Sequence, residues 1–449
     1  MPHDALQTYL DLMTPDLAAD SQAQIDRYQQ QHGLFFGPRP MCIVLRPRLM
    51  THAQYQFLCS RVRVLLQAFA KAEAAALKDA SFRQQFGLTP EEEELALLDP
   101  GYRCSYPTSR LDAFYVSDTE LKFTEYNSET PAGAGYNHAL SAMFLGLPIM
   151  REYLRKYHVH PVPTHTGVLH ALLDSYQQWS GRRERPRIGI LDWKEVPTYS
   201  EFVIFRDYFR AQGLECVIGD PREVEYKGGK LYAEGQQIDL IYKRVLISEL
   251  LQKGGINHPI IQAVRNGHVC MVNHFRCKIL FKKSSFAVLT DERNAHLFST
   301  PEQEVIATHV PWTRVVEERK TVYKGQTVDL IPHVIKYREN FVLKPNDEYG
   351  GKGIVLGWTK DAATWENAIK DALQSPHIVQ QRVRLPAEMF PVWQDNQLRV
   401  VQAMLDTAPY CCYGQYMEGS LCRIATDELL NVTAGTGSTV PTFLVEPRR

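Results

Sequence analysis

The sequence predicts a protein of mixed α/β and α+β architecture that begins with a mainly helical lobe. Apolar residues recur at helical spacing over 55–77, strand and helix patterns alternate between 188 and 244, and short strands alternate with single helices beyond 270. The chain has 449 residues, which exceeds the size that one hydrophobic core usually serves. We therefore expect several packed subdomains.

The composition is that of an ordinary globular protein, with 44% hydrophobic and 22% charged residues. The formal net charge is −1, so no global positive field favours binding to nucleic acid or to an anionic membrane. The N-terminus lacks the basic and apolar regions of a signal peptide, and no stretch has the length of a membrane span. Nine cysteines without CxxC spacing indicate reduced thiols, so we expect a cytoplasmic protein.

Four regions are expected along the chain. A mainly helical lobe covers 1–100, a hairpin with following helices covers 101–180, a Rossmann-like layer covers 181–270, and an α+β part covers 271–449. The Rossmann-like layer has no GxGxxG motif after its first strand, so the sequence does not support dinucleotide binding.

An acidic run stands at the start of one helix in the first lobe. Thr89 is the expected N-cap, Pro90 follows at the first helical position, and glutamates occupy positions 91–94. Acidic side chains are favourable at a helix N-terminus. We interpret the run as a solvated first helical turn and not as a metal cluster.

A glycine-rich turn between two strand patterns, over 341–356, is the most informative stretch of the sequence. Glycines let backbone N–H groups close around phosphate oxygens, and a lysine at the end of the incoming strand can reach the same phosphates. The candidate phosphate-binding residues are Lys344, Gly350, Gly351, Lys352 and Gly353. No GxxxxGK[ST] motif occurs, so the stretch is not a P-loop. The alternative is a tight hairpin with a solvated lysine.

A second hairpin is predicted over 110–127, where two strand-like runs flank a polar turn. If the turn centres on Asp118 and Thr119, facing residues lie at equal distances from that centre. The predicted facing pairs are Arg110 with Asn127 and Asp112 with Glu125. Because side chains alternate along a strand, all four lie on one face.

Two carboxylates and an amide oxygen on one face form a hard oxygen site that suits Mg²⁺. Arg110 beside them suits an anionic reacting group. The alternative is a surface hairpin with solvated acids, but directly opposed like charges are disfavoured across a sheet, which favours a bound cation. The segment 128–135 is rich in turn residues and precedes a helix. Its N–H groups could hold a substrate carboxylate or form an ordinary helix cap.

With both hairpins identified, the chain from about Gly101 onward resembles the circularly permuted ATP-grasp proteins, in particular the synthetase part of glutathionylspermidine synthase. In ordinary ATP-grasp enzymes the metal-binding Glu-x-Asn motif follows the lysine and glycine loop. Here Glu125-Tyr126-Asn127 precedes Lys344. The fold class implied is a circularly permuted ATP-grasp with a Rossmann-like substrate layer and an N-terminal helical lobe, in which 101–180 and 271–449 form the ATP-grasp part.

The resemblance also implies roles for single residues. Asp112, Glu125 and Asn127 would bind Mg²⁺, and Arg110 would steady the acyl phosphate and the transition state. The remaining implied contacts are with ATP: Lys278 and Lys344 to the phosphates, and Gln380, Gln381 and Val383 to the adenine through backbone groups. The segment 431–438 resembles the closing polar loop near the active site.

The implied function is a Mg-ATP-dependent carboxylate–amine ligase that forms an acyl phosphate and releases ADP and phosphate. Its partners would be a small-molecule or peptide carboxylate and an amine. The glutathione-contacting positions are not matched, so neither glutathione nor spermidine is implied as a substrate. Two alternatives remain, a catalytically silent nucleotide-binding regulatory protein and an ATP-dependent kinase with a hydroxyl acceptor.

Other reactive side chains receive plainer interpretations. The cysteines Cys104, Cys411 and Cys412 lack a matched base in the sequence, which favours buried thiols over nucleophiles. Four histidines crowd one short segment at irregular spacing, which favours surface histidines over a zinc site. These are His158, His160, His165 and His170.

Overall fold

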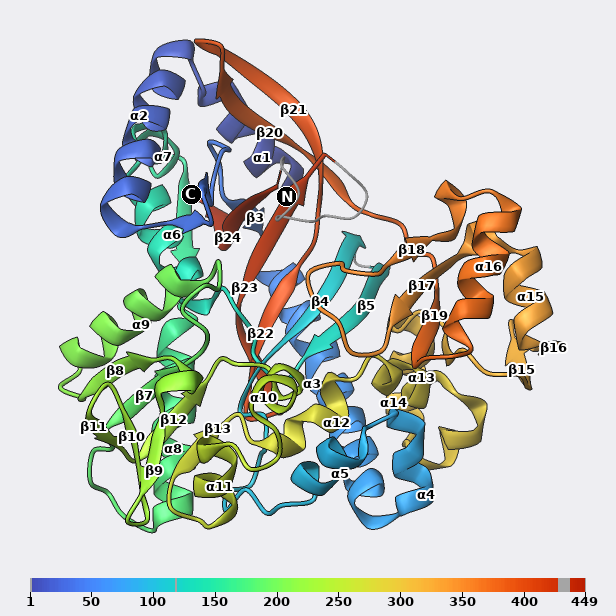
Figure 1. Cartoon of the computed structure of the whole chain (residues 1–449). Helices are drawn as coiled ribbons and strands as arrows, with labels where there is room; N and C mark the ends of the chain where they lie inside the picture. Colours follow the sequence, from blue (N-terminus) through green and yellow to red (C-terminus); the bar gives the residue numbers. More distant parts are fainter. Residues whose placement is uncertain (1, 118, 427–436, 449) are drawn as a thin grey trace.

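The computed structural model describes residues 2–117, 119–426 and 437–448. A long, mostly antiparallel sheet occupies the middle of the molecule, with a parallel α/β layer on one side and a smaller α+β part on the other (Figure 1). The predicted mixed architecture with N-terminal helices is confirmed. Among the described residues, no helix combines the length and the apolar character needed to cross a membrane.

The long sheet joins strands from opposite ends of the sequence in the order β20-β21-β23-β22-β4-β5. Strand β24 extends it by pairing with β23, β3 and β6. Its strands are β3 (Arg48–Met50), β4 (Thr108–Ser117), β5 (Glu120–Asn127), β6 (Tyr157–Pro161), β20 (Ala387–Gln394), β21 (Gln397–Leu405), β22 (Ala408–Cys412), β23 (Tyr416–Ala425) and β24 (Ser438–Pro447). In register, Tyr410 of β22 lies opposite Arg110 of β4, so the early hairpin and the C-terminal strands share one surface.

The parallel layer has the strand order β13-β12-β7-β8. Its strands are β7 (Ile188–Leu191), β8 (Cys216–Gly219), β12 (Leu240–Lys243) and β13 (Cys270–Val272). Helix α9 (Tyr199–Ala211) packs on β8, and α8 (His165–Ser180) packs on β12 and β13. The strand–helix–strand alternation expected here is confirmed, and the almost fully buried strands match the apolar runs that parallel sheets require.

Smaller elements complete this layer. They are the sheet of β9 (Glu225–Lys227), β10 (Lys230–Ala233) and β11 (Gln236–Ile238), with α10 (Ile247–Gly254) and α11 (Pro259–Arg265). Helix α10 follows β12 directly, so its first turn stands at the carboxyl end of the parallel sheet.

The α+β part is built on a sheet in the order β14-β19-β17-β18. Its main elements are β14 (Thr313–Val315), β17 (Phe341–Pro345), β18 (Val355–Leu356), β19 (His377–Gln381), α15 (Leu330–Lys336) and α16 (Ala362–Ala372), with a hairpin of β15 (Lys320–Tyr323) and β16 (Gln326–Asp329). Strands β17 and β18 pair antiparallel on either side of the glycine-rich turn, which confirms the predicted strand–turn–strand pattern.

The N-terminal helices divide between two hydrophobic cores. Helices α1 (Pro2–Leu12) and α2 (Pro15–His32) pack with α6 (Ala134–Gly146), α7 (Pro148–Tyr153) and the strands around β24. Helix α3 (His52–Lys78) instead packs with α12 (Lys278–Phe281), α13 (Ser284–Thr290) and α14 (Thr300–His309). The short strands β1 (Phe35–Phe36) and β2 (Arg39–Pro40) lie between the two groups along the chain.

Helix α5 (Pro90–Ala96) corrects the interpretation of the acidic run. Thr89 and Glu92 form the expected capping box, but Glu92 is buried and its carboxylate contacts Lys282 at 2.7 Å and Lys278 at 3.6 Å. The solvated interpretation holds for Glu91, which is exposed, and is wrong for Glu92. Sequence periodicity cannot reveal the lysines that pack over this turn, because they come from α12.

The capping glutamate generates a stability prediction. In Glu92→Gln the amide can keep the capping geometry, but the two buried ammonium groups lose one carboxylate partner. The free energy of unfolding should therefore fall by on the order of 3 kcal/mol. Urea unfolding followed by circular dichroism measures this. The matched control Glu91→Gln changes an exposed charge in the same turn and should stay within about 0.5 kcal/mol of the wild type. Equal effects of the two substitutions would contradict the structural role of Glu92.

Candidate functional site

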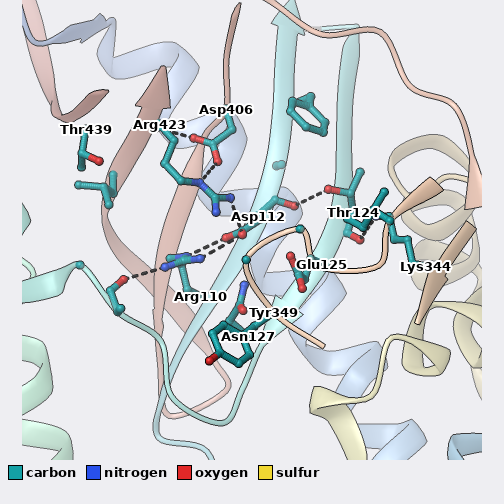
Figure 2. Close-up of a pocket in the computed structure, with 18 of the residues that line it drawn as sticks. Arg110, Asp112, Thr124, Glu125, Asn127, Lys344, Tyr349, Asp406, Arg423 and Thr439 are labelled. Atoms are coloured by element: carbon teal, nitrogen blue, oxygen red, sulfur yellow. Dashed lines mark hydrogen bonds and ion pairs between the residues drawn. The ribbon is translucent and has the colours of Figure 1, made fainter. Parts of the chain in front are cut away.

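A cavity of about 1110 Å³ lies where the long sheet, the parallel layer and the α+β part meet. The predicted hairpin residues Arg110, Asp112, Glu125 and Asn127 all line it. Lys344 and the start of the glycine loop line the cavity from the α+β part, and Asp192 lines it from the parallel layer. Figure 2 shows the hairpin side chains projecting toward the loop that carries Tyr349.

The hairpin β4–β5 has the predicted register at its functional end. Arg110 lies opposite Asn127, and Asp112 lies opposite Glu125. An irregularity after Asp112 shifts the pairing by one residue, and a second one before Ser117 shifts it back. The predicted pairing therefore holds at both ends of the hairpin but not in its middle. Of the two expected turn residues, position 118 lies outside the described residues.

Asp112 is held between two arginines. Arg110 donates to it from Nε at 2.7 Å and from a terminal nitrogen at 3.1 Å, and Arg423 donates at 2.6 Å. Burial opposes ionisation of this carboxyl, but both arginines outweigh burial and lower its pKa to about 2. Arg423 itself is fixed by Asp406, whose carboxylate accepts from its Nε at 2.6 Å. Asp112 is therefore an anion at neutral pH.

Arg423 and Asp406 were not predicted. Arg423 lies within β23, and Asp406 follows β21, so neither belongs to a local motif. Both line the cavity and approach the hairpin only because β22 and β23 pack beside β4 (Figure 2). The available signal was a charged residue within an apolar run, since Arg423 stands between the buried Cys422 and Ile424.

Glu125 and Asn127 complete the oxygen donors on the hairpin face. Lys283 contacts Glu125 at 2.9 Å, and the pKa of Glu125 is lowered because Lys283 and Lys344 together outweigh its burial and the nearby Asp112. The Nδ2 group of Asn127 is buried without a hydrogen-bond partner. That group is a hydrogen-bond donor, so the metal ligand of Asn127 would be its side-chain oxygen. Two ionised carboxylates and an amide oxygen are a donor set that fits a hard divalent cation such as Mg²⁺.

Lys344 ends strand β17 and points to the hairpin. Its ammonium donates to Gln380 Oε1 at 2.7 Å and to the backbone oxygen of Thr124 at 3.5 Å. Burial lowers the pKa of Lys344 to about 8, although Glu125 opposes the shift. A phosphate at this point would favour the charged form of the lysine and raise its pKa.

The glycine loop presents only part of its predicted set to the cavity. Gly350 and Gly351 line it, with φ of 64° and 77° that non-glycine residues rarely adopt. Gly353 instead packs against Pro345, and Lys352 is exposed and pairs with Glu348 at 3.3 Å. In this conformation the loop therefore reaches the cavity through its first two glycines.

Lys278 is not among the cavity-lining residues. Its ammonium is completely buried between Asp347 at 2.7 Å, Glu129 at 3.1 Å and Glu92. Three carboxylates surround the ammonium in this arrangement, and the phosphate contact implied by the resemblance stays a prediction. Lys278 and Lys282 share one face of the α12 turn, and both hold Asp347 at the start of the glycine loop.

Lys283 is the lysine of this segment that reaches the hairpin. It follows the end of α12, so its side chain leaves the face shared by Lys278 and Lys282. Its ammonium contacts Glu125 and donates to the backbone oxygen of Glu348 in the glycine loop. The available signal was the adjacent pair of lysines at 282 and 283, four and five residues beyond the expected one.

The expected adenine segment comprises most of β19 and the two residues that follow it. Gln380, Gln381 and Val383 all line the cavity. The N–H groups of Gln381 and Arg382 donate to Trp312 and Asn340, so an adenine would have to use other backbone groups here. Gln380 uses its side-chain oxygen to hold Lys344 and its amide nitrogen to donate to Thr313. Positions 431–436 of the expected closing loop lie outside the described residues.

In the segment 128–135, two N–H groups are already paired within the protein. The N–H groups of Gly133 and Gly135 donate to Glu201 Oε1 at 2.7 and 3.0 Å. Glu201 is completely buried and pairs with Arg244 at 3.3 Å. These two N–H groups therefore bind the carboxylate of Glu201. A substrate carboxylate was one of the two partners that the sequence allowed for this segment.

The carboxyl edge of the parallel layer forms the remaining wall. The strand order reverses between β7 and β12, and at such a switch point the strand ends leave a crevice. Asp192 and Arg244 follow these two strands, and Glu249 of α10 stands beside them. Burial raises the pKa of Asp192 to about 7, and the charge of Glu249 adds to the shift. Tyr349 of the glycine loop donates to Glu249 at 3.4 Å, which links loop and layer.

Comparison with known proteins agrees with this geometry. The family model for circularly permuted ATP-grasp type 2 matches residues 105–425. A glutathione synthetase-like effector from Globodera pallida has a TM-score of 0.61 at 11% identity, with 96% of this chain and 98% of the other chain covered. A Methylobacillus flagellatus protein, provisionally described as a gamma-glutamylcysteine synthetase, has a TM-score of 0.43 at 13% identity, with 85% of each chain covered.

No curated protein sequence matches the chain significantly. The structural likeness concerns the fold alone, since the identities are low. The family match covers well over half of the chain and includes both hairpins, Lys344 and the parallel layer. The chain therefore belongs to the circularly permuted ATP-grasp type 2 family.

Proposed function

We propose that this protein is a Mg-ATP-dependent ligase that activates a carboxylate as an acyl phosphate and joins it to an amine. ATP-grasp proteins are typically ATP-dependent carboxylate–amine ligases that use Mg²⁺. The observation that carries the proposal for this chain is the convergence of Asp112, Glu125 and Asn127 with Lys344 in one cavity. Phosphoryl transfer needs oxygen ligands for Mg²⁺ beside a lysine that can contact the phosphates.

The nucleotide side of the cavity supports ATP binding. Lys344 and the first glycines of the loop face the hairpin, and Lys283 lies between the loop and Glu125. Asp112, Glu125 and Asn127 would hold Mg²⁺, which when bound would neutralise phosphate charge as it moves toward ADP. The trio Lys278, Lys282 and Asp347 would act indirectly, by anchoring the start of the loop.

The first chemical step joins the carboxylate to the γ-phosphorus. A carboxylate oxygen forms the new O–P bond, the bond from phosphorus to the ADP oxygen breaks, and ADP leaves with the electron pair. Arg110 and Arg423 would stabilise the negative charge that increases in this step. Arg110 is held by Asp112 and by the backbone oxygen of Ala132. Fixed charges of this kind stabilise the transition state without reorganising during the reaction.

The amine is proposed to enter from the parallel layer. Asp192 and Glu249 give this wall negative charge, which suits an ammonium group. With its pKa near 7, Asp192 can take one proton from the ammonium at neutral pH. The amine nitrogen then forms the C–N bond, and the C–O bond to phosphate breaks. Phosphate leaves with the electron pair of that bond, and the nitrogen releases its second proton.

The first test measures ADP release from Mg-ATP with pooled carboxylates and amines. We expect release that requires both substrate types, and a loss of at least about 10²-fold in Glu125→Ala, because a metal-binding carboxylate is removed. The control Glu366→Ala removes an acid of helix α16 that pairs with Lys370 and does not line the cavity, and it should release ADP at the wild-type rate.

Hydroxylamine identifies the intermediate in the same assay. An acyl phosphate yields a hydroxamate, whereas a phosphorylated alcohol made by a kinase does not. ATP binding without ADP release from any pool would contradict the ligase proposal and favour a regulatory role.

The pKa of Lys344 predicts how ATP affinity depends on pH. In the empty site the lysine is charged below about pH 8, and bound phosphate favours the charged form, so affinity should be highest below pH 8 and fall as pH rises above it. Titration calorimetry between pH 7 and 9.5 measures this. Lys344→Arg keeps its charge throughout and should show a flatter profile. Identical slopes for the two proteins would rule out Lys344 as the titrating contact.

Asp192→Asn separates the two half-reactions. Without the proton acceptor, amide formation should fall by about 10²-fold or more, whereas hydroxamate formation should change only a few-fold, because hydroxylamine is uncharged at neutral pH. The matched control is Glu195→Gln, an exposed acid of the same turn, which should leave both rates unchanged. A parallel loss of both products in Asp192→Asn would contradict an acceptor-side role and point to a general defect.

A further inference from the structure

A second group of potential metal ligands lies outside the cavity, on the exposed side of strand β24. His52 begins helix α3, His160 belongs to β6, and Glu446 belongs to β24. The Nε2 atoms of His52 and His160 lie 3.2 and 3.5 Å from the same Glu446 oxygen. Among the described residues, no other group of three or more histidine, cysteine or carboxylate side chains brings its ligand atoms this close together.

The backbone around the group is fixed by the sheet. Strand β24 pairs antiparallel with β6, with Leu444 opposite His160, and parallel with β3, with Leu444 opposite Met50. Helix α3 starts directly after β3, and the Thr51 capping box sets the direction in which it leaves the sheet. Three separate segments therefore deliver their side chains to one point through hydrogen-bonded pairing and a helix cap.

The distances match coordination better than an ion pair. Zinc bonds of about 2.0–2.2 Å to nitrogen and oxygen in tetrahedral geometry place neighbouring ligand atoms roughly 3.3–3.5 Å apart. The two observed separations, 3.2 and 3.5 Å, are close to this spacing. A protonated histidine paired with a carboxylate would instead form a charge-assisted hydrogen bond of about 2.7–2.9 Å. Both histidines also share one oxygen, as ligands around a common ion would.

The chemistry of the ligands selects the class of ion. Imidazole nitrogen with one carboxylate suits zinc and related divalent transition metals, whereas the hairpin carboxylates and amide suit magnesium. His158 lies opposite Glu446 in register, but its ring centroid is 6.4 Å from that of His160, so it stands beside the group and not within it.

We propose that His52, His160 and Glu446 bind one zinc-class divalent cation that ties the C-terminal strand to β6 and to the start of α3. The four clustered histidines of the sequence are not the site, because His165 is buried near His138 and His170 lies on α8. His160 finds its partners at positions far from it in the sequence. A structural role follows from the position, since the ion would join three elements and face solvent with its remaining coordination site.

The test uses untagged full-length protein, stripped of metal and kept reduced. Excess Mg²⁺ is present so that the hairpin oxygens are saturated. Co²⁺ serves as the spectroscopic probe and Zn²⁺ as the calorimetric one. We expect one ion per chain, visible absorption bands of four-coordinate Co²⁺ that Zn²⁺ displaces, and a higher melting temperature with Zn²⁺ because only the folded chain holds the site.

The variants His160→Gln and Glu446→Gln should each weaken Zn²⁺ binding by at least about tenfold and abolish the melting shift. The control His296→Gln removes an exposed histidine elsewhere and should bind as the wild type does. Glu125→Ala should also retain Zn²⁺ binding, which separates this site from the proposed magnesium site. Equal Zn²⁺ affinity in His160→Gln and wild type, or no binding to the wild type, would overturn the proposal. Metal-free melting temperatures that agree among the variants exclude misfolding as the cause.

Discussion

The ion cluster around Asp112 is the interaction on which the arrangement of the site depends. Arg110 comes from the early hairpin and Arg423 from a C-terminal strand, and both donate to this one buried carboxylate. Asp406 holds Arg423 in turn. A buried carboxylate with two arginines is stable only while every member stays paired, because losing one leaves an uncompensated buried charge. The cluster therefore couples the position of β4 to that of β23 and fixes the cavity wall between them.

Charge is divided between two lysine groups with different tasks. Lys278 and Lys282 are held by Asp347 and Glu92 behind the glycine loop, whereas Lys283 and Lys344 face the hairpin. The first group is satisfied within the protein and positions the loop. The second has partners that a phosphate can replace, and the lowered pKa of Lys344 shows how incompletely the protein stabilises its charge.

The two proposed cation sites differ in their ligands and in their place in the sheet. The hairpin site uses hard oxygens inside the cavity, where the ion would share its shell with phosphate oxygens. The histidine group lies on the far edge of the sheet, beside β24, and has no part in the proposed ligation reaction. One sheet thus carries a proposed reaction site at β4 and β5 and a proposed structural site where β24 meets β6 and β3.

The sequence alone determined the local patterns. Period-two alternation and the polar turn were enough to predict that Asp112 faces Glu125, and the glycines predicted the turn between β17 and β18. Tertiary structure decided which charged residues join these patterns, including Arg423, Lys283, Asp192 and the pair of Glu446 with His160. It also placed Lys278 in a buried network with Asp347, Glu129 and Glu92, which its sequence position does not reveal. The physical reason is separation along the sequence. Periodicity and turn chemistry act over a few residues, whereas these contacts join strands and helices that lie tens to hundreds of positions apart.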